Sequence, residues 1–294
     1  MAEQPDADAD IAAAREAALL DLPAAEFEQF ARIITEQLGI RMPDAKLPML
    51  QGRLARRIRQ LQLSSFGEYR QYLFSPEHAE EEYVHFIDSV TTNKTDFFRE
   101  PTHFDFLVAN ALPALDREPN RPWRAKVWCA GCSSGEEAWT LAMTLAEYGR
   151  QRQGFDFSIL ATDISSRMLS RAREATYSRA IVEPVPAALR KQYLLSSRDS
   201  SRQLVRIVPG LRSRVTFHRL NFMDRVYDVR EMCDVIFFRN VMIYFDKTTQ
   251  EAVLNRLCRN LQPRGFLFTG HSESLAGLRV PLRQESLAVY RKRD

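Results

Sequence analysis

The sequence of 294 residues has no apolar run of about 18 residues, the length that a membrane-spanning helix requires. Residues 1–20 lack the basic segment that precedes the apolar part of a secretory signal. The four cysteines are too few for a disulfide framework in a chain of this length. These absences predict a cytoplasmic protein with no membrane insertion.

Strong excess charge is also missing. Charged residues make up 27% of the chain, and the formal net charge is only +3. Attraction of the whole surface to nucleic acid is therefore not expected. The hydrophobic content of 45% allows a sizeable core, in one large domain or in two.

The periodicity of apolar residues changes along the chain. We expect a flexible tail over 1–22, a small helical domain over 23–78 and a linker helix over 79–92. From Trp123 onward, the apolar runs KVWCA, FSILATD, CDVIFFRN, GFLFTG and LAVYRK alternate with helical stretches near 136–148, 165–175 and 248–261. This alternation predicts an α/β fold with a mostly parallel sheet. Residues 178–214 interrupt it and predict an inserted antiparallel β-subdomain.

A turn of small residues follows the first apolar run, in WCAGCSSGEEAW. Gly131 and Gly135 would let a ligand approach the backbone, and the helix after them offers unpaired amides. Neither the dinucleotide pattern G-x-G-x-x-G nor a P-loop is present. A tight strand-to-helix turn without a ligand is the alternative.

Acidic residues stand at two points where the same ligand would lie. Asp163 ends the second apolar run, where a carboxylate can accept hydrogen bonds from a ribose, although it could instead cap the next helix. Glu136 and Glu137 open the first helix and would suit a cationic ligand or simply the helix dipole. Enzymes that use NAD share this arrangement, but the missing third glycine favours S-adenosylmethionine.

Three further blocks are more specific than the glycine turn. They are TNKTDFFRE at 92–100, FFRNVMIYFD at 237–246 and GFLFTGHSESL at 265–275. With WCAGCSSGEE, they make the chain resemble the CheR family of chemoreceptor glutamate methyltransferases from about Pro23 onward. The resemblance implies a Rossmann-like class I methyltransferase sheet, in an S-adenosylmethionine-binding catalytic domain over 93–294 that contains the inserted β-subdomain. It also implies S-adenosylmethionine as cofactor, S-adenosylhomocysteine as product, and the cytoplasmic helical domain of chemotaxis receptors as partner.

The resemblance also assigns site residues. Arg99 and Tyr244 should stand closest to the transferred methyl group and the receptor glutamate. The other residues expected to contact or surround the cofactor are Asn93, Thr95, Arg99, Gly131, Glu136, Glu137, Asp163, Asn221, Phe222, Arg239 and Asn240.

The implied reaction needs no general base, because a glutamate carboxylate, with an ordinary pKa of about 4.3, is already ionised at neutral pH. Arg99 could grip that carboxylate in a fork or hold a carboxylate of the cofactor, and the sequence does not decide between them. A surface ion pair for Arg99 and a core position for Tyr244 are the plainer alternatives.

Two stretches bear on the partner. GRLARRIRQL is expected to place Arg53, Arg56, Arg57 and Arg59 opposite its apolar stripe, as a docking surface for an acidic partner or as a solvated face. Relatives that bind a receptor C-terminal pentapeptide carry extra glycines in a loop of the β-subdomain. Here that stretch reads LLSSRDSSRQ, which predicts independence from the pentapeptide.

Other interpretations compete with this one. Cys129 and Cys132 have metal-ligand spacing, but no second pair matches them, so no metal site is expected. GHSES lacks the final glycine of a hydrolase nucleophile elbow. A nucleic-acid methyltransferase and a non-enzymatic cofactor-sensing or receptor-binding module remain alternatives, and a monomer is the default expectation.

Overall fold

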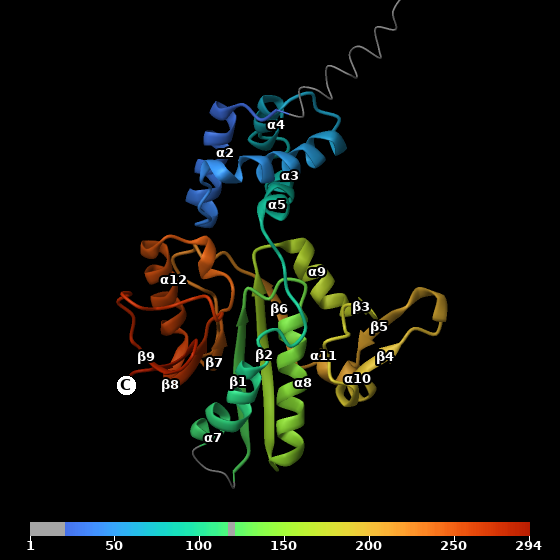
Figure 1. Cartoon of the computed structure of the whole chain (residues 1–294), viewed down its shortest axis with the longest axis vertical. Coiled ribbons are helices and arrows are strands. Elements are labelled where there is room, and N and C mark those ends of the chain that lie inside the picture. Colours follow the sequence, from blue (N-terminus) through green and yellow to red (C-terminus); the bar gives the residue numbers. More distant parts are fainter. Residues whose placement is uncertain (1–20, 117–120) are drawn as a thin grey trace, which may run out of the picture. The chain divides into compact units, whose positions relative to one another are not determined.

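The computed structural model describes residues 21–116 and 121–294. They form two compact units, one ending at Thr92 and the other beginning at Asn93 (Figure 1). Most of the tail expected over 1–22 lies outside the described residues. Within the described ranges, no helix has both the length and the apolar character needed to cross a membrane.

In the residues that the structure describes, 21–92, the first unit contains helices and no strand. Its helices are α2 (Ala24–Leu38), the 3-10 turn η1 (Asp44–Lys46), α3 (Leu47–Gln60), α4 (Phe66–Leu73) and α5 (Ala79–Val90). Helix α2 ends at Gly39 in a left-handed conformation, and the Ser65 side chain caps α4 by accepting from the Glu68 amide. Helix α5, expected as a linker, packs against α3 and α4 through Phe86 and its apolar neighbours, so it belongs to the body of this unit.

The arginine face of α3 differs from the expectation. Arg57 pairs with the carboxylate of Glu82 at 2.6 Å, and the Tyr69 hydroxyl donates to the same carboxylate at 2.8 Å. Arg53 donates to the Val90 carbonyl. The placement of both residues opposite the apolar stripe was wrong. Arg57 follows Leu50 by seven residues, about 20° short of two full turns, so it lies on nearly the same side of the helix as Leu50. Only Arg56 and Arg59 of the four are exposed.

The second unit is built on a seven-stranded sheet of order β6-β2-β1-β7-β8-β10-β9. Strands β6, β2, β1, β7 and β8 are parallel, whereas β10 runs antiparallel to β8 and β9. The strands are β1 (Trp123–Ala130), β2 (Phe155–Asp163), β6 (Val215–Arg219), β7 (Cys233–Phe237), β8 (Leu261–Phe268), β9 (Leu282–Ser286) and β10 (Val289–Lys292). The expected α/β fold is confirmed, with β6 and β9 as additional strands.

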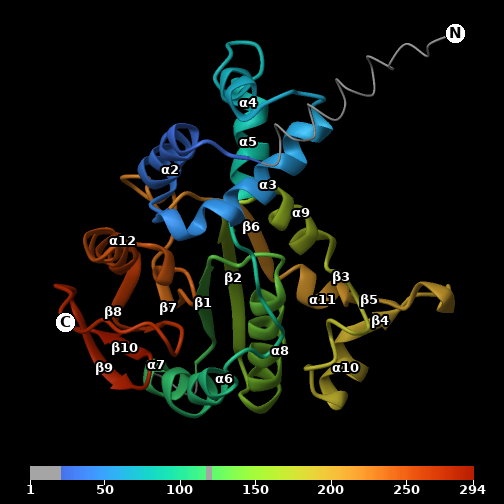
Figure 2. The ribbon, with the colours of Figure 1, turned by 45° about the horizontal axis from the view of Figure 1, so that its top comes forward.

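Helices cover this sheet. Helix α8 (Glu136–Gln151) lies along β2, α12 (Lys247–Arg259) along β8, and α9 (Ser166–Glu174) near β6 (Figure 2). Helix α6 (Thr102–Phe106), the π-helical turn η2 (Leu107–Ala111) and α7 (Leu112–Leu115) form one continuous stretch before β1. The buried core joins both layers, for example through Phe104, Trp139 and Phe237.

The expected antiparallel insertion is present as a separate three-stranded sheet, β3-β5-β4. It begins at residue 176, slightly before the expected start, and both figures show it beside α8 on the side away from β7 and β8. Its elements are β3 (Thr176–Ser178), α10 (Ala187–Tyr193), β4 (Leu194–Ser196), η3 (Ser200–Arg202), β5 (Leu204–Ile207) and α11 (Pro209–Arg212).

The parallel arrangement positions the expected site. The carboxyl ends of parallel strands meet at one edge of a sheet, and ligands bind there in folds of this kind. Gly131 follows β1, Asp163 ends β2, Asn221 comes just after β6, Arg239 just after β7, and Gly270 just after β8.

Candidate cofactor and catalytic site

The turn after β1 has a conformation that requires small residues. Gly131 and Gly135 have φ of 88° and 99°, in the left-handed region. A Cβ atom on Gly131 would lie 2.6 Å from Val241 Cγ2 and 4.0 Å from the Phe222 ring. The loops after β1, β6 and β7 therefore meet closely at this glycine.

Asp163 ties this turn to the end of β2. Its Oδ2 accepts from the Ser133 amide at 2.8 Å, and its Oδ1 accepts from the Ser165 amide at 2.9 Å. The cap of α9 is Ser165, whose hydroxyl oxygen accepts from the Met168 amide. The capping role considered for Asp163 thus belongs to Ser165, and the Asp163 carboxylate organises the two loops instead.

Arg239 forms two ion pairs within the site. Its side chain is fully buried and pairs with Glu137 at 2.8 Å and with Glu100 at 2.9 Å. It also donates to the Arg99 carbonyl at 2.5 Å. One guanidinium therefore joins the loop after β7, the start of α8 and the segment that carries Arg99.

The pKa values of the two carboxylates beside Arg239 shift in opposite directions. Burial raises the pKa of Glu137, and the charge of Arg239 opposes that rise only in part. Burial also acts to raise the pKa of Glu100, but hydrogen bonding to Arg239 and its charge outweigh this effect, so the pKa is lowered. The ion pair holds Glu100 ionised more firmly than Glu137.

Glu136 is turned toward the glycine turn rather than toward Arg239. Its carboxylate accepts from the Ser134 hydroxyl at 2.7 Å, and burial raises its pKa. In the same turn, the Ser133 hydroxyl donates to the Asn93 carbonyl at 2.9 Å. This bond places the segment that begins at Asn93 directly beside the turn.

That segment is strained around Arg99. Phe98 and Glu100 have φ of 53° and 55°, which is unusual for residues other than glycine. Arg99 between them is half-buried, and its guanidinium donates to the Lys94 carbonyl at 3.3 Å. Residues held in such conformations cluster at functional sites, because the surrounding structure must enforce them.

The loop after β7 is held by a second buried carboxylate. Glu273 accepts from the amides of Gly270 at 2.6 Å, Asn240 at 2.8 Å and Ile243 at 3.3 Å. Asn240 itself has φ of 58°. Burial raises the pKa of Glu273, and the amides oppose this rise. Glu273 thus fixes the loop that leads into η4 (Met242–Tyr244).

The loop after β6 completes the edge. The Phe222 ring packs against Phe238, and its carbonyl accepts from the Tyr227 hydroxyl at 2.8 Å and from Arg256 at 2.6 Å. The side-chain oxygen of Asn221 accepts from the Met223 amide at 2.9 Å. Both expected residues therefore lie in one hydrogen-bonded turn.

Comparison with known proteins identifies the family. The family model of the CheR methyltransferase S-adenosylmethionine-binding domain matches residues 93–290, and that of the CheR all-alpha domain matches 25–91. The chain belongs to the CheR methyltransferase family. It is a methyltransferase that uses S-adenosylmethionine, which confirms the expected family and cofactor.

Individual relatives agree. The chain is similar to a chemotaxis protein methyltransferase of Escherichia coli K12, with 37% identity over 92% of each chain. It is also similar to chemotaxis protein methyltransferase 2 of Pseudomonas aeruginosa PAO1, with 36% identity over 90% of this chain and 92% of that one. The solved CcbJ methyltransferase of Streptomyces caelestis superposes with a TM-score of 0.32 at 16% identity, over 55% of this chain and 49% of that one, a similarity too low to carry an argument.

Within this CheR methyltransferase, the expected site residues fall into two groups. The contacts described above hold one group in the loops at this edge, and they include the backbone of Arg99; the group consists of Asn93, Gly131, Glu136, Glu137, Asp163, Asn221, Phe222, Arg239 and Asn240. Thr95 and Tyr244 are half-buried, and the Tyr244 amide donates to the Val241 carbonyl at 3.2 Å. The catalytic roles of Arg99 and Tyr244 stay predictions.

Glu100, Ser133, Ser134 and Glu273 hold the site together but were not singled out from the sequence. All four lie inside the blocks that carry the family resemblance. Glu273 was considered only as part of a hydrolase-like motif. Two features of the sequence could have pointed to the acidic residues: Glu100 stands beside the expected site residue Arg99, and Glu273 comes shortly after Gly270.

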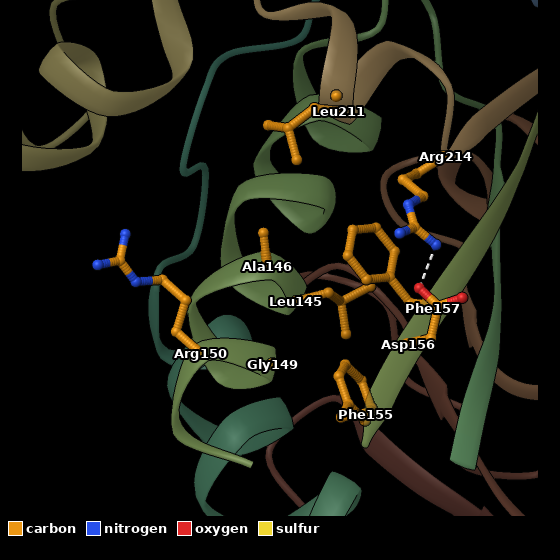
Figure 3. A pocket seen from close by; sticks show the side chains of 10 residues that line it. Leu145, Ala146, Gly149, Arg150, Phe155, Asp156, Phe157, Leu211 and Arg214 are labelled. Atoms are coloured by element: carbon orange, nitrogen blue, oxygen red, sulfur yellow. Dashed lines mark hydrogen bonds and ion pairs between the residues drawn. The ribbon is translucent and has the colours of Figure 1, made fainter. Parts of the chain in front are cut away.

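A separate cavity lies away from this edge. It has a volume of about 270 Å³ and is lined by the second half of α8, the beginning of β2 and residues just before β6 (Figure 3). The side chains of Leu145, Phe155 and Phe157 point into it, and Arg214 pairs with Asp156 at its rim. It is at the amino end of β2, so it is not the donor site.

We expect Glu273→Gln to lower methyl transfer at least tenfold while the protein stays folded. The glutamine keeps one acceptor oxygen but turns an NH₂ group toward backbone N–H donors, which costs about 1–3 kcal/mol per unsatisfied group. Circular dichroism would report the fold, and kcat and KM would be measured separately. Glu285→Gln, an exposed change on β9, is the control. Unchanged turnover in Glu273→Gln would show that Glu273 does not position the loop.

Proposed function

We propose that this methyltransferase esterifies glutamate side chains in the cytoplasmic helical domain of chemotaxis receptors. The observation that carries the proposal is the match to chemotaxis protein methyltransferases over about nine tenths of the chain. The site blocks around Arg99, Arg239 and Glu273 all lie inside the matched region. The proposal also implies a cytoplasmic location, and a monomer remains the expected form.

The residues of the edge fit a cationic nucleotide-like donor. The Gly131 turn leaves no room for a side chain, because Val241 and Phe222 from two other loops pack against it, and this brings three loops together around the donor position. Asp163, Glu136 and Glu137 supply carboxylates around the turn. When bound, S-adenosylmethionine supplies a methyl group activated by the positive sulfonium.

The protein's task is alignment rather than proton transfer. The receptor carboxylate is ionised at neutral pH, so attack by its oxygen needs no base. A new oxygen–carbon bond forms as the carbon–sulfur bond breaks, and the electron pair leaves with sulfur. Arg99 and Tyr244 would orient the carboxylate and exclude water, and the strained backbone at Phe98 and Glu100 supports a functional role for Arg99.

The test is methyl transfer from radiolabelled S-adenosylmethionine to receptor fragments. We expect label that is released by mild base, the behaviour of a carboxyl methyl ester. Arg99→Ala should lower transfer by about 100-fold, because orientation of the reacting groups is lost. Arg230→Ala, at an exposed position, should transfer normally. Base-stable label, or label found only on nucleic acid, would refute the proposal.

We further propose that Arg56 and Arg59 dock the acidic face of the receptor helices. These two exposed side chains remain of the four arginines considered, because Arg53 and Arg57 bond within the helical unit. Attraction between exposed charges weakens as salt screens it.

Replacing both Arg56 and Arg59 with alanine should therefore raise the KM for receptor several-fold and flatten its rise with ionic strength. The KM for S-adenosylmethionine should not change. Arg32→Ala, an exposed arginine on α2, is the matched control. A KM for the native protein that is constant from low to high salt would contradict docking by charge.

We also propose that the enzyme acts without a pentapeptide tether. The loop between β4 and β5 has no glycine, and Asp199 holds it by accepting from the Ser201 amide at 3.0 Å and by pairing with Arg202 at 3.2 Å. Titration calorimetry with a receptor C-terminal pentapeptide should give no measurable heat of binding. Micromolar affinity would overturn this expectation.

A further inference from the structure

Three side chains with metal-binding groups converge beside the Arg239 ion pairs. Glu100, His103 and His271 each offer one ligand atom, and these atoms all lie within 4.8 Å of one another. Glu100 precedes α6 and His103 is the second residue of that helix, whereas His271 follows β8. The sequence did not predict this cluster, because His271 lies 171 positions after Glu100 in the chain.

His103 is the unusual member. It is only 1% exposed. Among the described residues, neither of its ring nitrogens makes a hydrogen bond of ordinary geometry, and its hydrogen-bonding partner is the backbone of Leu287, through a weak bond. Its Nδ1 lies 3.5 Å from a carboxylate oxygen of Glu100, and its ring meets the His271 ring edge-on at 4.6 Å between centroids. A buried imidazole whose nitrogens make only such long contacts can take a water or an ion as a closer partner.

The donor set is specific. Two imidazoles and one carboxylate form the protein ligands of many sites for zinc and similar transition metals, with a fourth position open to water. Calcium and magnesium prefer oxygen ligands alone. His271 is exposed, which leaves the open position facing solvent.

Burial and the charge of Arg239 both act against a positive charge at His103 and lower the pKa of this imidazole to about 4, but two carboxylates offset the charge of Arg239. That guanidinium pairs with both Glu137 and Glu100, so the group holds one more carboxylate than guanidinium. The bonds from Arg239 and from the His271 amide both end on Oε2 of Glu100.

We propose that Glu100, His103 and His271 bind one divalent transition-metal ion of the zinc class. Zinc–nitrogen bonds are about 2.0–2.1 Å long, so the exposed His271 side chain must swing toward the buried His103 when the ion binds. The ion then connects the segment that carries Arg99 with the loop after β8, which contains both His271 and Glu273. This makes the donor-site edge sensitive to metal without the ion taking part in methyl transfer.

Titration calorimetry of the metal-free full-length protein with zinc chloride tests the proposal. We expect one ion per chain with micromolar or tighter affinity, and a thermal midpoint that rises with zinc. His271→Ala should weaken binding at least tenfold and remove the thermal shift. His218→Ala, an exposed histidine on β6, should bind as the native protein does.

Three results would overturn the proposal. They are the absence of a one-to-one site, equal zinc affinity in His271→Ala, and an equal thermal shift when magnesium chloride replaces zinc. Because both variants change exposed residues and the readouts are binding and stability, the outcome does not depend on the methyl-transfer assay.

Discussion

The buried guanidinium of Arg239 is the constraint on which the rest of the site depends. A buried arginine is stable only when its charge is matched, and Glu100 and Glu137 supply that match from two other segments. Losing one partner of such a group costs about 3–5 kcal/mol, since an uncompensated charge remains in the interior. The pairing therefore fixes the start of α8 and the backbone of Arg99 relative to β7.

Two further carboxylates act on the backbone rather than on other side chains. Asp163 accepts amides from the loops after β1 and β2, and Glu273 accepts amides around the loops after β7 and β8. Each joins loops of neighbouring strands. Together with Arg239, they convert the flexible ends of separate strands into one preformed edge, which suits a reaction whose main requirement is alignment.

The sequence predicted those parts of the fold that are buried on both faces. Strands β1, β2 and β7 read as continuous apolar runs because helices cover them. Strands β6 and β9 lie at the edges of the sheet and are largely exposed, so they carry no such run and were not expected. The helical angle between Leu50 and Arg57 was enough to predict that Arg57 faces a different way from Arg56 and Arg59. Its partner Glu82 lies 25 residues further along the chain and could be identified only from the fold.

Those parts of the site that consist of sequence motifs could be predicted. Those in which a side chain accepts hydrogen bonds from backbone amides could not. Gly131 and Asp163 were recognised from their positions after strands. The hydrogen bonds that Glu273 and Asp163 accept from backbone amides could not be predicted from the sequence, because every residue except proline carries the same N–H group.

Because nearly every residue carries a backbone N–H group, these hydrogen bonds place few limits on which side chains the site loops can carry. A carboxylate that binds an amide is indifferent to the side chain attached to it, so Ser133, Ser165 and Ile243 can change identity without loss of these bonds. Proline is the exception at each of these places, as it removes the donor itself. At these three positions the two acids exclude proline, whereas the hydroxyls of Ser133 and Ser165 make further bonds that favour serine for a separate reason.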